Sequence, residues 1–248
     1  DQGLEKLLTM YLTVYQYWET ITTTKFAQYT GDDMLLHFGE VESFVILYLS
    51  LIDVPLQIVE QEPRILETSG VSLEQISAYE NLVRSTVQMA SDSLNLTESG
   101  PHFPPFDITK SSYIDELVTR SRYVSAVDPR RPDDQKTTLL TNLMPRLQNL
   151  VRPETYIDYH LKVGRRLRDL GQDNLAVSAF ERALKKAEDL GYTGSATEAS
   201  TLLAEQYGKA KNWQKASQYA DKAATNLGTE LFTPGGLSDA KMKEKSDE

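Results

Sequence analysis

The sequence predicts an all-α protein, with an N-terminal helical bundle followed by a helix-turn-helix repeat domain. Apolar residues recur at three- and four-residue steps over long stretches of the first half. Small residues recur at an interval of about 40 residues between Tyr156 and Leu227, as from Gly164 to Ala204. The composition, 40% hydrophobic and 25% charged, is that of an ordinary globular protein. The expected organisation is a bundle over residues 1–97, a proline-rich linker with short helices over 98–152, repeats over 153–227 and a flexible tail over 228–248.

The N-terminal region is typical of long amphipathic helices. One apolar stripe runs from Leu4 to Ile21 and a second from Met34 to Ile52. Pro55 is expected to kink or end the second helix. A third helix is expected to start at Ser72, where Ser72-Leu73-Glu74-Gln75 has the form of a capping box. Aromatic residues in the first stripe are expected to fill the bundle core, with a ligand-stacking surface as the alternative; they are Tyr11, Tyr15 and Trp18.

The middle of the chain is punctuated by prolines. Glu98 to Ser112 is expected to be a linker without regular helix, followed by a short helix around Tyr113 to Tyr123. The acids and arginines of the next loop, residues 128–134, are expected to neutralise one another and cap the following helix. A metal or phosphate site is the alternative interpretation of that loop. The following leucine-rich helix is interrupted at Pro145, and Pro153 is expected to open the repeats.

Two helix-turn-helix units are predicted between Tyr156 and Leu227. Gly171 and Gly191 stand where a helix is expected to stop. The stretch Ser195-Ala196-Thr197-Glu198 is expected to cap the third helix of the four. The residues that carry the pattern are Gly164, Leu167, Gly171, Ala176, Phe180 and Ala183, then Ala204, Tyr207, Ala216, Tyr219, Ala220 and Ala223. This pattern resembles a tetratricopeptide repeat, whose usual period is about 34 residues. The extra residues are expected in Gly191 to Thr197.

The resemblance implies a function in protein binding. In tetratricopeptide repeats the first helix of each pair lines a concave groove that holds a peptide or a helix. The chain is therefore expected to be a non-catalytic scaffold, adaptor or linker subunit of a larger complex. The Lys and Asn pattern of the family members that clamp a C-terminal carboxylate is absent. The groove positions implied are Asp158, Leu161, Arg165, Arg168 and Asp169 in the first repeat, and Glu198, Thr201, Glu205 and Lys209 in the second.

The charge distribution bears on the kind of partner. The net charge is −10, and residues 1–100 hold 4 Lys/Arg against 15 Asp/Glu, which disfavours nucleic acid as a partner. The expected ligand is an acidic or helical segment of another protein. Seven basic residues of the repeats form either a patch for such an acidic segment or simply solvated helix faces. They are Lys162, Arg165, Arg166, Arg168, Arg182, Lys185 and Lys186.

The sequence contains no recognisable catalytic, cofactor-binding or metal-binding pattern. The absence of cysteine excludes disulfides, thiolate nucleophiles and Cys-ligated zinc. His37, His102 and His160 are far apart in sequence, and His160 is expected to pack inside the first repeat. We therefore expect no enzymatic activity, no cofactor and no metal. A carboxylate hydrolase is a further hypothesis, which two buried carboxyl groups facing each other in a cleft would support.

An alternative function is an extracytoplasmic ligand-sensing domain of a membrane receptor, with the ligand in the N-terminal bundle. The lack of cysteine, together with a start at Asp1 rather than Met, favours an extracytoplasmic or organellar compartment. No transmembrane segment is predicted, because the longest apolar run, Phe44 to Ile52, is too short to cross a bilayer.

Overall fold

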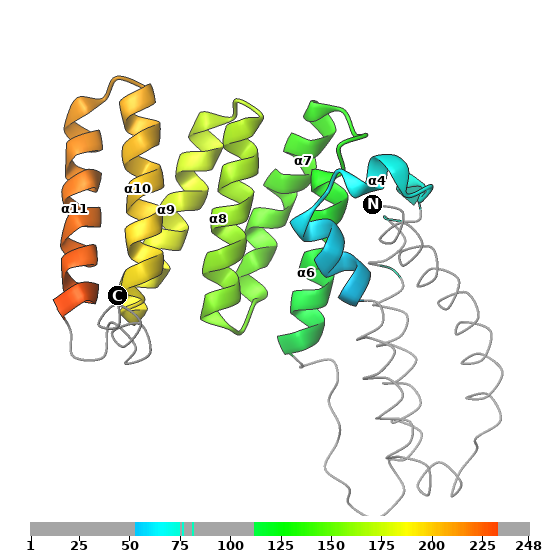
Figure 1. Ribbon diagram of the computed structural model, residues 1–248, viewed down its shortest axis with the longest axis horizontal. Coiled ribbons are helices and arrows are strands. Elements are labelled where there is room, and N and C mark those ends of the chain that lie inside the picture. The colour runs from blue at the N-terminus through cyan, green and yellow to red at the C-terminus, as the bar shows by residue number, and fades with distance from the viewer. Residues whose placement is uncertain (1–52, 75, 77–80, 82–111, 233–248) are drawn as a thin grey trace, which may run out of the picture. The chain divides into compact units, whose positions relative to one another are not determined.

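The computed structural model of the chain describes residues 53–74, 76, 81 and 112–232 (Figure 1). The chain divides into two compact units between Leu143 and Met144. All regular secondary structure in the described ranges is helical, which confirms the predicted all-α class. The helices predicted before residue 53, the linker residues 98–111 and the tail from residue 233 lie outside the described residues, as do Tyr11, Tyr15 and Trp18.

The first unit is described through a helical segment at residues 53–61, α4 (Ile65–Thr68), α6 (Ser112–Val127) and α7 (Asp133–Leu143). Pro55 does not end a helix, because the chain stays helical through residue 61. α6 runs further than the short helix predicted around Tyr113 to Tyr123, because no helix-breaking residue precedes Asp128-Pro129. Side chains from all these segments form its core, including Leu56, Val59, Leu66, Leu117, Val124, Leu140 and Leu143.

Ion pairs join segments of this unit that are distant in sequence. Arg120 on α6 pairs with two carboxylates of the segment 53–61, Asp53 and Glu60, with 2.9 Å between its Nε and the Glu60 Oε2. Gln57 donates a further hydrogen bond of 2.6 Å to the Asp53 Oδ2. The two acids are largely buried and contact one guanidinium group. Such a buried and fully paired cluster fixes the position of one helix relative to another.

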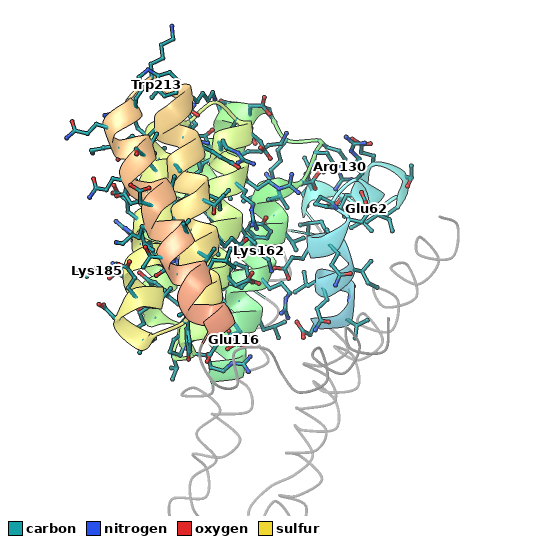
Figure 2. All side chains as sticks on the ribbon, turned by 60° about the vertical axis from the view of Figure 1, so that its left-hand side comes forward. Glu62, Glu116, Arg130, Lys162, Lys185 and Trp213 are labelled. Atoms are coloured by element: carbon teal, nitrogen blue, oxygen red, sulfur yellow. The ribbon has the colours of Figure 1, made fainter. Side chains whose placement is uncertain are left out.

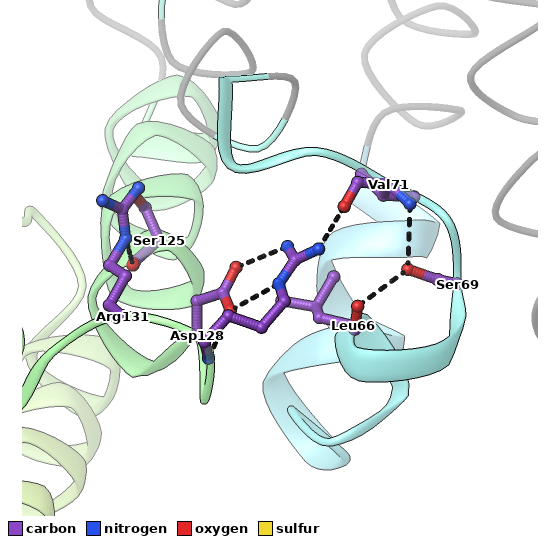
Figure 3. A network of polar contacts seen from close by, with 7 residues as sticks. Leu66, Ser69, Val71, Ser125, Asp128 and Arg131 are labelled. Atoms are coloured by element: carbon purple, nitrogen blue, oxygen red, sulfur yellow. Dashed lines mark hydrogen bonds and ion pairs between the residues drawn. The ribbon is translucent and has the colours of Figure 1, made fainter.

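The arginine-rich loop after α6 is also internally neutralised (Figure 3). Asp128 is fully buried, and Arg130 contacts it through Nη2 at 2.7 Å and through Nε at 3.0 Å. Arg130 also donates to the carbonyl of Val71, which links this loop to the segment after α4. Arg131 donates from Nε to the carbonyl of Ser125 at 2.7 Å. The predicted neutralisation of acids by arginines is therefore confirmed at Asp128 and Arg130.

The second unit contains the repeats. After the 3-10 helix η3 (Met144–Asn149) come α8 (Pro153–Asp169), α9 (Asp173–Leu190), α10 (Thr193–Lys209) and α11 (Trp213–Phe232), each packed on the next (Figure 1). α8 and α10 begin at 153 and 193, and α9 and α11 at 173 and 213, so the period is 40 residues in both cases. The predicted tetratricopeptide-like pair of helix-turn-helix units is confirmed.

The turns within the two helix pairs have the same hydrogen bonds. In the first, the N–H groups of residues 170, 171 and 172 donate to the carbonyls of 166, 168 and 167; in the second, every partner lies 40 residues later. Both turns place one residue in the left-handed region, Gly171 with φ 72° and Lys211 with φ 58°. The two helix pairs thus repeat one backbone structure, although their side chains differ.

Two predictions about the start of α10 are wrong. Ser195-Ala196-Thr197-Glu198 does not cap that helix, and Gly191 to Thr197 is not an inserted loop. Gly191 ends α9 in the left-handed conformation, as predicted, and only Tyr192 separates it from the start of α10 at Thr193. The long period is taken up by helices of 17 to 20 residues. α11 also continues to Phe232, past the predicted end of the repeats at 227.

The glycine in the middle of α8 permits close packing within the first pair. A Cβ atom at Gly164 would lie 3.0 Å or less from three ring atoms of Phe180, whose side chain is completely buried. One period later the two positions hold Ala204 and Ala220. The second pair therefore combines a slightly larger residue on the first helix with a much smaller one on the second.

Candidate protein-binding face

The first helices of the two pairs, α8 and α10, are connected by side-chain contacts. Tyr192, just before α10, donates from its hydroxyl to the Glu154 Oε1 at 2.6 Å. Arg165 pairs with Glu198. Near the other end of the helices, the Arg168 Nη1 lies 3.4 Å from the Glu205 Oε2. Because the contacts run along both helices, they bring the predicted groove positions of the two repeats together.

Eight of the nine predicted groove residues are exposed or half-buried, and we refer to them as the α8–α10 face. The side chains of Arg165 and Glu198 keep 40% and 44% of their surface exposed, and that of Glu205 keeps 58%. At such exposure, each ion pair contributes at most about 1 kcal/mol. The residues of the face are Asp158, Arg165, Arg168, Asp169, Glu198, Thr201, Glu205 and Lys209.

Leu161 does not belong to this face. Its side chain is only 4% exposed and forms part of the core of the repeats. A partner could not contact it without disturbing that core. The repeat period locates the helix but does not by itself distinguish a residue on the exposed side from an apolar residue that turns inward.

The basic residues of α8 do not form an unpaired patch. Lys162 Nζ lies 2.7 Å from the Asp158 Oδ2, and the Arg166 Nη1 lies 3.9 Å from the Asp169 Oδ2. Arg165 and Arg168 pair with acids of α10, as described above. On α9, three further basic residues have no ion pair within the part of the chain that the structure describes. They are Arg182, Lys185 and Lys186, and Lys185 lies at the surface (Figure 2).

Three residues at the ends of the face were not predicted. Asp173, at the start of α9, contacts the Lys209 Nζ at 3.0 Å. Glu154 accepts the hydrogen bond from Tyr192, which lowers the pKa of its carboxyl group. The sequence separations of the four contacts are 33, 36, 37 and 38 residues, all slightly less than one period. Complementary residues at such separations are the signal that could have identified them.

His160 is a packing residue, as predicted. It is completely buried, and its Nδ1 lies 3.0 Å from the Tyr156 carbonyl oxygen, with the two rings 4.2 Å apart. Burial lowers the pKa of the imidazole to about 4, so the side chain is neutral near pH 7. Its Nε2 has no hydrogen-bond partner among the described residues. His37 and His102 lie outside those residues.

Two buried carboxyl groups of the first unit are held by one arginine. Asp53 and Glu60 both contact Arg120, so each carboxylate is held by a cation instead of facing the other acid. Within the described ranges, no group of three His, Asp or Glu side chains is arranged to hold a metal ion. None of the described helices combines the length and the apolar character needed to cross a bilayer.

No protein-family model matches the chain, and no curated protein matches it. Among solved structures, the chain is similar to a Signal Transduction ATPase with Numerous Domains (STAND) protein with a tetratricopeptide repeat sensor from Pyrococcus horikoshii. The sequences are 16% identical, the match covers 90% of this chain and 39% of that protein, and the TM-score is 0.40. At that TM-score the likeness supports no inference about function.

Proposed function

We propose that the chain is a protein-binding scaffold or adaptor that holds a segment of another protein on the α8–α10 face. The observation that carries the proposal is the set of exposed ion pairs between equivalent helices of the two repeats. These pairs arrange charged side chains in a fixed order along one surface. Because each pair is weak, a ligand can exchange it for its own charged groups at little cost.

The charge order of the face favours a ligand with both signs of charge. A purely acidic segment would meet Arg165 and Arg168, but it would also approach Glu198 and Glu205. A helical or extended segment that alternates acidic and basic residues can pair with both helices. We therefore propose a ligand segment that carries both acidic and basic residues. The acidic segment that the basic residues of the repeats predict is not tested by these contacts.

We propose further that this binding occurs without chemistry. The carboxylates, guanidinium groups and ammonium group of Glu198, Glu205, Arg165, Arg168 and Lys209 are ion-paired. The Thr201 hydroxyl donates to the Thr197 carbonyl at 2.9 Å. The ligand-sensing alternative places the ligand in the N-terminal bundle, residues 1–97, and most of that range lies outside the described residues.

The proposal is tested by affinity capture from the native source. The intact chain is compared with a variant carrying Arg165→Glu and Arg168→Glu, and with a matched control carrying Arg182→Glu and Lys185→Glu on α9. Both variants change the net charge equally and alter only exposed or half-buried positions. We expect a specific protein to be retained by the intact chain and the control but lost from the first variant. Equal retention by all three would exclude the α8–α10 face as the binding surface.

A further inference from the structure

A second surface, on the outer side of α11, carries five exposed residues at regular spacing, of which four are apolar and one is a serine. Trp213 is 68% exposed and Leu227 is 46% exposed. Between them, Ser217, Ala220 and Ala224 are also exposed. The five positions follow one another at steps of four, three, four and three residues, which is the spacing of a helix-packing seam. We call these five residues the α11 seam. Trp213 lies at the surface at the start of the helix (Figure 2).

The first repeat shows what occupies this position when another helix follows. The residues of α9 one period before Ala224 and Leu227 are Leu184 and Ala187, and both are buried. Phe180, one period before Ala220, is buried too, although its ring lies against Gly164 of α8. α9 and α11 each pack on the first helix of their own pair, so that contact is common to both. In addition, α9 packs against α10, the helix that follows it, and α11 has no such neighbour among the described helices. The α11 seam thus corresponds to the face of α9 that the next helix covers.

Polar contacts support the same correspondence. On α9, Asp173 contacts Lys209 at 3.0 Å and Glu181 accepts from the Tyr207 hydroxyl at 3.2 Å, and both donors belong to α10. One period later these positions hold Trp213 and Asp221. We consider a helix that packs on α11 in the way that α10 packs on α9. It would contact the apolar Trp213 ring at one end and the Asp221 carboxylate near its middle. Its matching residues would be apolar at the first point and a donor or cation at the second.

We propose that the α11 seam binds an amphipathic helix of another protein, with an apolar stripe against the seam and a Lys or Arg beside Asp221. A second copy of this chain fits less well. In an antiparallel pair of α11 helices that places Trp213 against Leu227, the centre falls near residue 220, and the two Asp221 carboxylates approach each other. Like charges at that point oppose self-association. This surface is separate from the α8–α10 face, and the proposal does not depend on it.

The test uses the full chain with a photoreactive benzoylphenylalanine in place of Ala224, crosslinked in extracts of the native source. The matched control carries the same group in place of the neighbouring exposed Thr225. We expect residue 224, but not 225, to crosslink to one segment of another polypeptide. That segment should have apolar residues at three- and four-residue steps and a basic residue on its flank. Crosslinks to residues 233–248 of the same chain, to a second copy or to scattered segments would overturn the proposal. So would a crosslinking yield at residue 224 no higher than that at residue 225.

A peptide of the crosslinked segment then gives a quantitative test. Ala224→Glu and Asp221→Lys should each weaken its binding by at least about tenfold, whereas Thr225→Glu should change it by less than about twofold. Binding should shift the Trp213 fluorescence to shorter wavelength, measured as the difference from a Trp213→Phe chain. The Arg165→Glu and Arg168→Glu variant should bind the peptide as the intact chain does. An unchanged affinity for Ala224→Glu would refute the proposal even if the α8–α10 face binds its own ligand.

Discussion

Single residues decide how closely the repeat helices pack, and Gly164 is the clearest case. Gly-to-Ala substitution within a helix normally stabilises it by about 1 kcal/mol. At Gly164 the added methyl group would collide with the Phe180 ring. We predict that Gly164→Ala lowers the free energy of unfolding by about 1–3 kcal/mol, the usual cost of overpacking. Urea unfolding followed by circular dichroism measures it.

The control for this substitution adds Phe180→Leu to Gly164→Ala. The smaller side chain leaves room for the new methyl group, so the effect of Gly164→Ala should be smaller in the Phe180→Leu background than in the intact chain. If Gly164→Ala alone increased the free energy of unfolding, helix propensity would outweigh the contact with Phe180. The close approach of α8 and α9 would then be absent.

His160 gives a prediction about pH. Burial lowers its pKa from 6.5 to about 4, so between these values the unfolded chain binds a proton that the folded chain does not. The stability associated with neutral His160 is present above pH 6.5 and lost as the pH falls towards 4, by about 3 kcal/mol in all. The measurement is the free energy of unfolding against pH for the intact chain and for His160→Phe. Parallel curves for the two proteins would contradict the prediction.

For single residues, the sequence predicts which side chains lie at the surface better than it predicts their ion-pair partners. The repeat pattern predicts Arg165, Arg168, Glu198 and Glu205 as groove residues, and all four are exposed or half-buried. It did not predict that they pair with each other, because pairing depends on the lateral offset between two helices packed in three dimensions. Leu161 was misplaced for a related reason, since small rotations of α8 decide whether a residue at the edge of the face is buried.

At the scale of the elements, the backbone of the turn between α10 and α11 is strained at one residue, and a substitution can relieve that strain. Lys211 has φ 58°, in the position that Gly171 occupies in the first repeat. A non-glycine residue in the left-handed region costs about 1 kcal/mol. We predict that Lys211→Gly raises the free energy of unfolding by up to about that amount. Lys211→Ala removes the same charge but keeps the strain, and it should give no gain. Equal stabilisation by both variants would point to charge instead of backbone conformation.

Helix ends were predictable where a glycine permits the left-handed backbone or a proline fixes φ. Gly171 and Gly191 adopt positive φ at the ends of α8 and α9, and Pro153 lies in the first turn of α8. The prediction failed at the start of α10, where the capping pattern at Ser195 competes with the stop at Gly191. The chain reverses within two residues after Leu190, so helix α10 has already begun before Ser195. A side-chain cap pattern is weaker evidence than an adjacent glycine stop.

At the scale of the whole molecule, the division into two units predicts a stable fragment. The second unit has its own core, with Leu167, Phe180 and Leu203 completely buried. We predict that residues 144–248 expressed alone are helical and unfold in one cooperative transition, as expected for a domain with its own core. Thermal unfolding by circular dichroism tests this. A fragment without a cooperative transition would show that the repeats need the first unit.

The central claim is that the α8–α10 face binds a protein segment, and exchanging one ion pair tests it most directly. In a chain with Arg165→Glu and Glu198→Arg, the pair is kept and its stability should be unchanged, but the charges are exchanged between α8 and α10. The affinity for the captured protein is measured by calorimetry for this variant and the intact chain. We predict a loss of at least about tenfold, because the ligand meets reversed charges. Equal affinity for both chains would contradict the claim, since the pair would then have only a structural role.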